Sequence, residues 1–381
     1  MSKGEQFPAE WRTYPDPISG VPVQQLTNYK GHSHHFYFTN PGWYDHDRNL
    51  LFASDRNNRT NLYSLELATG VITQLTDLDP VPLPREVEFL RACVSPQNNA
   101  AYFWHEYKLM ALDLTTLEER ILYVMPAKFD VSMINVTADG KFVCASISED
   151  MSDRFPVDLL RGYVGFRETW AAKPLSRIMR VAVNGTGAEV VWEEEYWVGH
   201  VNTSPTQPHL LTFCHEGPWQ LVDNRIWGLD MDTGRAWQIR PREEPDERVG
   251  HEYWHADGIY LSYHGQKPNG DKFFGKVRYD NTERQEYAFP HTTGHIHSND
   301  FRFIVGDGGK VVRLWQWNGE GFDGPKALCQ HRSSMHIQQT HVHPRFSPDG
   351  SYVVFTSDVS GYGNVYRVEV ADFQALPDVE D

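Results

Sequence analysis

The chain has 381 residues, with 35 Lys and Arg against 51 Asp and Glu and a formal net charge of −16. Such an acidic excess disfavours non-specific attraction to nucleic acid or to an anionic membrane surface, so an anionic ligand requires a local cationic pocket. A 13% aromatic content, 29 Gly, 23 Pro and short β-branched runs such as YVVFTSD favour one large all-β domain over two separate domains.

The N-terminal residues, MSKGEQFPAEWRTYPDP, lack the apolar segment of a signal peptide. No run elsewhere approaches the roughly 20 apolar residues that a membrane helix needs. We therefore expect a soluble, cytoplasmic protein with no membrane partner. The cysteines are far apart and form no CxxC pair, which indicates neither a zinc knuckle nor a disulfide framework. We interpret all of them as buried thiols in a reducing compartment: Cys93, Cys144, Cys214 and Cys329.

A pattern of short strands and turns repeats from residue 45 to the end of the chain. Each copy consists of a strand, a polar turn, a strand, a turn, a strand, a turn of Thr-Gly type and a further strand. The copies begin near residues 45, 95, 137, 205, 254, 298 and 347. Four antiparallel strands repeated at roughly 40 to 60 residues are typical of β-propeller blades. We predict a seven-bladed β-propeller that forms a single domain over residues 1–381.

Two segments depart from this repeat. The stretch VPVQQLT, residues 21–27, resembles the fourth strand of the first copy, VITQLT, whereas the last copy ends without a fourth strand. We predict that residues 21–27 complete the last blade and close the ring, because closure leaves no open sheet edge. Residues 148–176 are predicted to be a helical insertion, since helical periodicity is otherwise scarce and the stretch from Ser152 to Ala172 is long enough for a helix.

The chain has 18 histidines, and several of them recur in a similar register. Short phrases precede the second-strand turn of several copies: GHSHHF at residue 31, GHVN at 199, GHEYW at 250, GHIHSN at 294 and THVHPRF at 340. Because the first strand of each blade lines the central channel of a propeller, these positions are expected to converge. The alternative is that each histidine fills the channel and bonds a neighbouring carbonyl group.

His341 and His343 lie one residue apart in THVHPRF, which we expect to be a strand with both imidazoles on one face. His295 comes from the neighbouring copy, and Gln338 lies three residues before His341. Three imidazoles and an amide oxygen suit a divalent ion such as manganese, iron, nickel or zinc. Since this set contains no carboxylate, a bound ion keeps a net positive charge, and an anionic substrate is the expected partner.

His251 and the phrase CHEGPWQLVDNRIW, residues 214–227, belong to the fifth and fourth copies. Within that phrase, Arg225 is a candidate to bind a substrate carboxylate with its guanidinium fork. The alternative is that Arg225 forms a surface ion pair with Asp223 or Glu216. His215 and Glu216 are as compatible with a scaffold as with a site.

Together these phrases resemble the oligogalacturonate lyases, a family of seven-bladed propellers that act on short pectic oligosaccharides. The resemblance runs over nearly the whole chain, from RTYPDPISGVPVQQLT to FTSDVSGYGNVY. HEGPWQLVDNRIW and QTHVHP are specific phrases, whereas SPDG and TSD are shared with TolB-like propellers. The chain departs from the family in HHFYFTNPGWYDHD of the first copy and in an additional His297. These departures leave open the exact sugar, as well as the roles of His297, His34 and His35.

The resemblance implies a catalytic base at His251 and a catalytic, substrate-binding arginine at Arg225, with His200 and His215 as further substrate-binding candidates. It implies metal ligands at His295, Gln338, His341 and His343, with Mn²⁺ as the usual ion. The implied partner is an acidic oligogalacturonide, which is cleaved during pectin degradation to unsaturated or 4-deoxy keto-uronate monosaccharides. A homo-oligomer is left open.

The chemistry fits these residues. In β-elimination from a uronate, a metal neutralises the carboxylate and stabilises the enolate-like charge that develops, while neutral His251 accepts the C5 proton. The alternatives are a uronate lyase of different sugar specificity, a non-catalytic TolB-like binding scaffold, and a metal-dependent hydrolase or isomerase of sugar acids. A lyase differs from a hydrolase in forming an unsaturated product end without consuming water.

Overall fold

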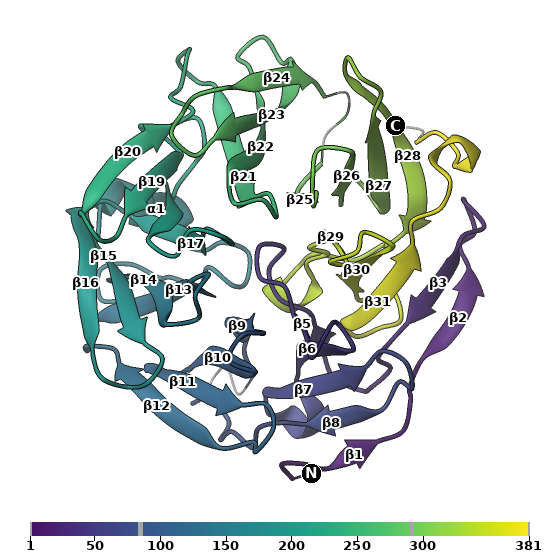
Figure 1. The fold of residues 1–381 in the computed structure, drawn as a ribbon, viewed down its shortest axis with the longest axis horizontal. Helices are drawn as coiled ribbons and strands as arrows, with labels where there is room; N and C mark the ends of the chain where they lie inside the picture. The colour runs from purple at the N-terminus through teal and green to yellow at the C-terminus, as the bar shows by residue number, and fades with distance from the viewer. Residues whose placement is uncertain (1, 83–86, 290, 292, 380–381) are drawn as a thin grey trace. The chain divides into compact units, whose positions relative to one another are not determined.

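The computed structural model describes residues 2–82, 87–289, 291 and 293–379. Over these residues the strands form seven separate antiparallel sheets (Figure 1). The fold is an all-β, seven-bladed β-propeller, which confirms the prediction from the repeats. The chain divides into two compact units. The first unit comprises Met1–Leu90, Leu114–Leu117 and Pro290–Asp381, and the second comprises Arg91–Asp113 and Glu118–Phe289.

The first unit contains three sheets. One contains β1 (Gln6–Phe7), β8 (Ile72–Gln74), β7 (Asn61–Glu66), β6 (Asn49–Ser54) and β4 (Ser33–His34), and β5 (Trp43–Tyr44) also pairs with β6. Another contains β25 (Ile296–His297), β26 (Phe303–Gly306), β27 (Val311–Trp317) and β28 (Phe322–Gln330). The third contains β2 (Arg12–Pro15), β3 (Pro22–Gln25), β31 (Asn364–Glu369), β30 (Tyr352–Ser357) and β29 (Arg345–Phe346).

The third sheet joins the two ends of the chain. β3 lies antiparallel to β31, with Val23 opposite Val368, and both side chains pack in a fully buried cluster with Val353. Burying one such side chain contributes ~1.5–3 kcal/mol. A hydrogen bond such as that from Thr27 Oγ1 to Asn364 Oδ1, at 3.0 Å, contributes only ~1 kcal/mol. Apolar burial therefore dominates the attachment of this N-terminal strand.

The second unit contains four sheets of four strands each. The first two contain β9 (Ala92–Ser95), β10 (Ala100–His105), β11 (Lys108–Asp113) and β12 (Glu119–Val124), then β13 (Phe129–Val136), β14 (Phe142–Glu149), β15 (Leu175–Ala182) and β16 (Ala188–Glu195). The other two contain β17 (Val198–Thr203), β18 (Leu210–His215), β19 (Ile226–Asp230) and β20 (Arg235–Ile239), then β21 (Arg248–Trp254), β22 (Tyr260–Gln266), β23 (Lys272–Arg278) and β24 (Gln285–Ala288).

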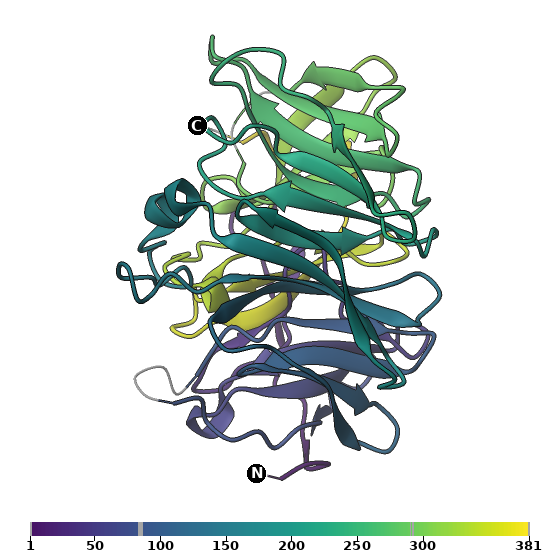
Figure 2. The same cartoon turned by 90° about the vertical axis from the view of Figure 1, so that its left-hand side faces the viewer.

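The connection between β14 and β15 contains a short helix, α1 (Phe166–Ala172), which lies beside the strands of this unit in Figure 2. The sequence allowed a helix from Ser152 to Ala172, but its first two thirds form turns and an isolated bridge. Gly165 adopts a left-handed φ of 78° at the N-cap, where a Cβ would lie 2.5 Å from the carbonyl oxygen of Pro156. Glycine and proline thus confine the helix to its last two turns.

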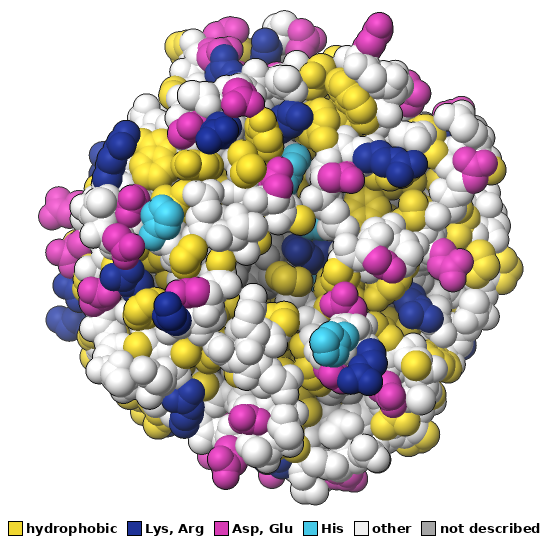
Figure 3. All heavy atoms as spheres, viewed as in Figure 1, with side chains coloured by type: hydrophobic (Ala, Val, Ile, Leu, Met, Phe, Trp, Pro, Cys, Tyr) yellow, Lys and Arg dark blue, Asp and Glu magenta, His cyan; other side chains and the backbone are white. Residues whose placement is uncertain are grey.

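The charged side chains and the cysteines lie where the composition predicts. Lys and Arg side chains are interspersed with Asp and Glu over the face shown in Figure 3. All four cysteines are buried and free. Within the part of the chain that the structure describes, no helix is both long and apolar enough to cross a membrane.

Candidate functional site

Three histidines of the first unit come together in the fold. His295, His341 and His343 are buried, and one potential ligand nitrogen from each lies within 4.8 Å of the other two. Their ring centroids are 4.3 Å apart for His295 and His343, 5.5 Å for His341 and His343, and 5.7 Å for His295 and His341. The structure therefore brings together the imidazoles that the sequence placed in one ligand set, and we call them the histidine triad.

Asp307, which the sequence analysis did not identify, fixes the first member of the triad. Its carboxylate accepts hydrogen bonds from the backbone N–H of His295 at 2.8 Å and from the ring Nδ1 at 2.7 Å. Burial alone would raise the pKa of Asp307, but its electrostatic interaction and its hydrogen bonds with His295 hold that pKa below its usual value. With Nδ1–H donated to a carboxylate, Nε2 of His295 carries the lone pair, which is the usual arrangement behind a metal-binding histidine. Gly294 permits this approach, because a Cβ there would lie 2.6 Å from Asp307 Oδ1.

The expected strand over THVHPRF is wrong for residues 340–344, and only its last two residues form a strand. Gln338–Thr340 form a 3₁₀ turn that ends at His341, and β29 begins only at Arg345. His343 has a left-handed φ of 45° and is followed by Pro344, which has no N–H to donate to a sheet. The segment is instead held to β30 by a bond from Thr356 N to Val342 O, at 3.0 Å. Turn geometry, rather than strand alternation, therefore places His341 and His343 together.

Gln338 begins this turn and is half-buried. Its backbone carbonyl accepts a hydrogen bond from His341 N at 3.2 Å, so the two residues are held in one tight turn. A role for its side-chain oxygen as a fourth ligand stays a prediction.

Aromatic rings surround the triad. Tyr37 and Phe38 come from the segment of the first copy that departs from the family pattern, and both are buried. The Tyr37 ring lies 4.8 Å from that of His343, and the Phe38 ring lies 5.6 Å from that of His295. Burial, reinforced by the neighbouring His295, lowers the pKa of His341 to about 4. At neutral pH this imidazole is uncharged, which is the form that binds a metal ion.

His34 and His35, whose roles the sequence left open, lie close to the histidine triad. His34 is fully buried and stacks on Phe89 at 4.8 Å, and burial lowers its pKa to about 3. The ring of His35 forms a hydrogen bond of 3.2 Å from Nε2 to the carbonyl oxygen of Val342, between the last two members of the triad. His35 therefore acts on the site by bracing the segment that positions His341 and His343.

In the second unit, His251 lies at an irregularity of β21. The register between β21 and β22 shifts between Gly250 and Tyr253, and His251 has a left-handed φ of 53°. Bulges of this kind re-aim a side chain at the cost of roughly 1–3 kcal/mol of local strain. His200 repeats the arrangement on β17, where the shift lies between Gly199 and Asn202 and its φ is 46°. Both histidines follow glycine in the sequence, but their backbone conformation was not apparent from that phrase.

Arg225 precedes β19 and is nearly fully buried between two carboxylates. Its Nη1 donates to Glu216 Oε1 at 2.8 Å, and its Nε lies 3.5 Å from Glu252 Oε2. The ion pair with Glu216 is the alternative that the sequence raised, although the pair is buried rather than on the surface. His200 Nε2 lies 3.1 Å from the other oxygen of Glu216. Burial would raise the pKa of Glu216, but Arg225 and His200 hold it well below its usual value.

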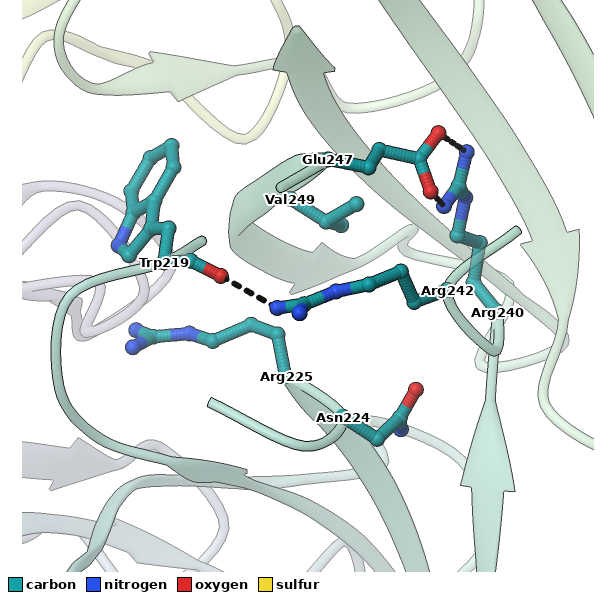
Figure 4. A pocket seen from close by; sticks show the side chains of 7 residues that line it. All are labelled: Trp219, Asn224, Arg225, Arg240, Arg242, Glu247 and Val249. Carbon is teal, nitrogen blue, oxygen red and sulfur yellow. Dashed lines mark hydrogen bonds and ion pairs between the residues drawn. The ribbon is translucent and has the colours of Figure 1, made fainter. Parts of the chain in front are cut away.

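A small pocket opens beside Arg225 (Figure 4), where the side chains of Arg225 and Arg242 extend toward the Trp219 segment. Its lining residues are Trp219, Asn224, Arg225, Arg240, Arg242, Glu247 and Val249. Arg240 is neutralised by Glu247, at 2.5 and 2.7 Å. Arg242 instead donates to the backbone carbonyls of Trp219 and Gln220, at 2.8 and 3.0 Å. These two carbonyl groups carry no net charge, so they do not neutralise the Arg242 guanidinium.

His215 has both ring nitrogens engaged in hydrogen bonds. Nδ1 lies 2.6 Å from Asp223 Oδ1 and Nε2 lies 3.1 Å from Glu194 Oε1, while its ring stacks on Tyr196 at 3.9 Å. Burial would lower the pKa of His215, but the two carboxylates raise it above its usual value. These contacts favour a scaffold role over the substrate-binding role that we considered for His215.

A second group with metal-ligand chemistry contains His200, Cys214 and Glu216. Burial, together with Glu216 and Glu252, raises the pKa of the Cys214 thiol well above its usual value despite the opposing charge of Arg225. The thiol is therefore protonated at neutral pH, and Glu216 is already bound to Arg225. The group is better described as the buried network that holds Arg225.

The chain is similar to known proteins in family, sequence and structure. The family model described as oligogalacturonate lyase matches residues 1–320. An oligogalacturonide lyase of Pectobacterium atrosepticum is 29% identical over 396 residues, which covers 98% of this chain and 99% of the relative. A solved oligogalacturonate lyase in complex with manganese has a TM-score of 0.87 and 28% identity, over 98% of this chain and 99% of that structure. These matches confirm the resemblance, and we conclude that this chain is an enzyme that belongs to the oligogalacturonate lyase family.

Proposed function

We propose that this enzyme cleaves short oligogalacturonides by metal-dependent β-elimination, giving unsaturated or 4-deoxy keto-uronate monosaccharides. The observation that carries the proposal is the buried histidine triad, in which the ring of His295 is hydrogen-bonded to Asp307. The names of the relatives from Pectobacterium atrosepticum and Dickeya dadantii support the substrate class, and the manganese complex supports the ion. The four free, buried cysteines are consistent with the reducing cytoplasm as its location.

The residues of the triad fit a divalent ion, and Mn²⁺ is the one we propose. His295, His341 and His343 would supply three imidazole nitrogens, and Gln338 would add an amide oxygen from the adjoining turn. This donor set contains no carboxylate, so the site would keep the positive charge of the ion and attract a uronate. When bound, the ion supplies Lewis-acid stabilisation to the carboxylate next to the carbon that loses its proton.

The residues of the second unit supply the proton transfer and the binding of substrate. We assign His251 as the base that accepts the C5 proton, whose bonding electrons then form the C4–C5 double bond. The C4–O bond breaks in turn, and the leaving sugar oxygen takes up a proton. Arg225, oriented by Glu216 and Glu252, is assigned to bind a uronate carboxylate, and His200 to contact the substrate beside it. Atoms balance without water.

The identity of the sugar in the substrate is tested by measuring turnover of a panel of uronate oligosaccharides with different linkages. We expect turnover of digalacturonate and trigalacturonate, with formation of an ultraviolet-absorbing conjugated double bond. Turnover confined to another uronate would retain the lyase chemistry and replace the sugar. No turnover of any member by metal-loaded enzyme would leave the binding scaffold as the better description.

Removal of the metal is expected to abolish activity. Because three neutral imidazoles hold the ion without a carboxylate, a strong chelator should extract it, and added Mn²⁺ should restore the rate in proportion to the metal bound. Metal content by elemental analysis and initial rate on digalacturonate are measured on the same samples. Full turnover by enzyme shown to be metal-free would refute the metal dependence.

A further inference from the structure

His251 has a second histidine, His264, as a hydrogen-bond partner. Nδ1 of His251 lies 2.8 Å from Nε2 of His264. The two ring planes differ by only 13°, and the ring centroids are 5.1 Å apart. Nearly parallel rings with this centroid separation and with nitrogens in hydrogen-bond contact lie edge to edge in roughly one plane. This arrangement directs the lone pair of one nitrogen along the N–H of the other, as a strong hydrogen bond requires.

The local fold holds the pair in place from several sides. His264 is buried on β22, directly opposite Gly250, whereas His251 lies on the irregular part of β21 and is half-buried. The indole ring of Trp219 packs edge-on against both imidazoles, with centroids 4.8 Å from His251 and 5.7 Å from His264. A Cβ at Gly250 would lie 2.4 Å from the Trp219 ring, so glycine is required for this contact.

Arg242 fixes Trp219 in turn. Its guanidinium donates a hydrogen bond to the backbone carbonyl of Trp219 at 2.8 Å (Figure 4) and another to that of Gln220 at 3.0 Å. These hydrogen bonds fix the backbone at Trp219. From this position the indole ring packs against the two imidazoles. The orientation of His251 is thus determined by packing as well as by its hydrogen bond to His264.

The hydrogen bond between two neutral imidazoles has two possible directions, and they differ in chemistry. If Nδ1–H of His251 donates to Nε2 of His264, then Nε2 of His251 carries a lone pair and can accept a proton. If Nε2–H of His264 donates instead, the remaining proton of neutral His251 lies on its own Nε2, which then cannot act as a base. The partner of Nδ1 therefore decides whether His251 is competent.

We propose that His264 is a positioning residue that accepts the Nδ1–H of His251 and keeps the Nε2 lone pair of His251 available for the substrate proton. The proposal rests on the assignment of His251 as the base. When the C5 proton moves to His251 Nε2, the ring becomes an imidazolium. Its Nδ1–H remains donated to the neutral ring of His264, which stabilises the new charge by a charge-assisted hydrogen bond.

Two amide substitutions separate this role from packing. The side-chain amide of glutamine reaches approximately the position of the imidazole Nε2, whereas that of asparagine reaches the position of Nδ1. His264→Gln therefore retains a hydrogen-bonding atom next to His251, and His264→Asn removes it while remaining polar. We expect kcat on digalacturonate to fall by about 10²-fold in His264→Asn, the typical effect of misplacing a catalytic group, and by much less in His264→Gln. KM and bound metal should change little in either variant.

The tautomer of His251 gives a readout that does not depend on turnover. In enzyme labelled with ¹⁵N at histidine, His251 should carry its proton on Nδ1, with its signals identified by their loss in His251→Ala. In His264→Asn we expect a shift toward the Nε2–H tautomer. A wild-type His251 protonated on Nε2 would overturn the proposal.

The activity outcomes separate failure of this inference from failure of the base assignment. If His251→Ala turns over normally, then His251 is not the base and the proposed function fails at that residue. If His251→Ala is inactive but folded His264→Asn keeps normal kcat, the role of His264 is wrong and that of His251 stands. Equal losses in His264→Asn and His264→Gln, with matching falls in the unfolding midpoint, would show that His264 serves packing alone.

Discussion

Replacing His251 with alanine is expected to lower kcat by about 10²- to 10⁴-fold, the usual contribution of a positioned base, with a smaller effect on KM. The base accepts the C5 proton only in the transition state, so its loss should affect the chemical step more than substrate binding. The metal content should stay unchanged, because the ligands we propose are His295, Gln338, His341 and His343. Steady-state kinetics and elemental analysis of the same protein preparation test both statements.

Two outcomes would contradict the assignment of His251. A near-normal kcat would show that another group removes the proton, and a loss of bound metal would place His251 among the ligands. The pH dependence offers a further check in unchanged enzyme. Activity should fall as the solution is acidified through the range in which imidazole titrates, because a protonated ring cannot accept a proton.

His343→Ala is expected to lose the metal and the activity together while the fold survives. Loss of an outer partner of a metal ligand costs roughly 10- to 100-fold in affinity, and loss of a direct ligand should cost more. His343 lies between a 3₁₀ turn and β29, outside the named strands. The sheets and their apolar clusters should therefore remain stable, with a loss of about 1 kcal/mol in the free energy of unfolding.

His297→Ala is the matched control. His297 is also a buried histidine of the first unit, but it lies on β25, outside the triad, and its Nδ1 accepts a hydrogen bond from Phe346 N at 3.3 Å. Its removal leaves a buried N–H without its partner, at a cost of about 1–3 kcal/mol, so stability should fall while bound Mn²⁺ is retained. If His343→Ala kept its metal and His297→Ala lost it, the ligand set would have to be reassigned.

The sequence predicted the fold well because a propeller blade is encoded locally. Strand alternation, turn residues and a fixed period are all read along one stretch of chain, and seven copies reinforce one another. The strand from residues 21–27 was found because it resembles VITQLT, and β3 (Pro22–Gln25) does pair with β31. The helix from Ser152 was predicted too long, because the prediction used helical periodicity and did not include the turns that Pro156 and Gly165 favour.

The site was predicted less completely because its geometry depends on bulges and on contacts between strands. The triad converges as expected, but through a turn and a left-handed His343 rather than through strand alternation. Asp307 and His264 were missed because each acts on a histidine from a neighbouring strand. The register offers a signal for His264: once the turn between Trp254 and Tyr260 is fixed, regular pairing places His264 opposite His251, and the irregularity of β21 shifts it opposite Gly250.

The central claim, β-elimination, is tested most directly by weighing both products of trigalacturonate cleavage by mass spectrometry. The balance of atoms requires that the two product masses sum to the mass of the substrate, with one product unsaturated. We expect that result from metal-loaded enzyme. A sum greater by one water, with both products saturated, would show hydrolysis and contradict the account.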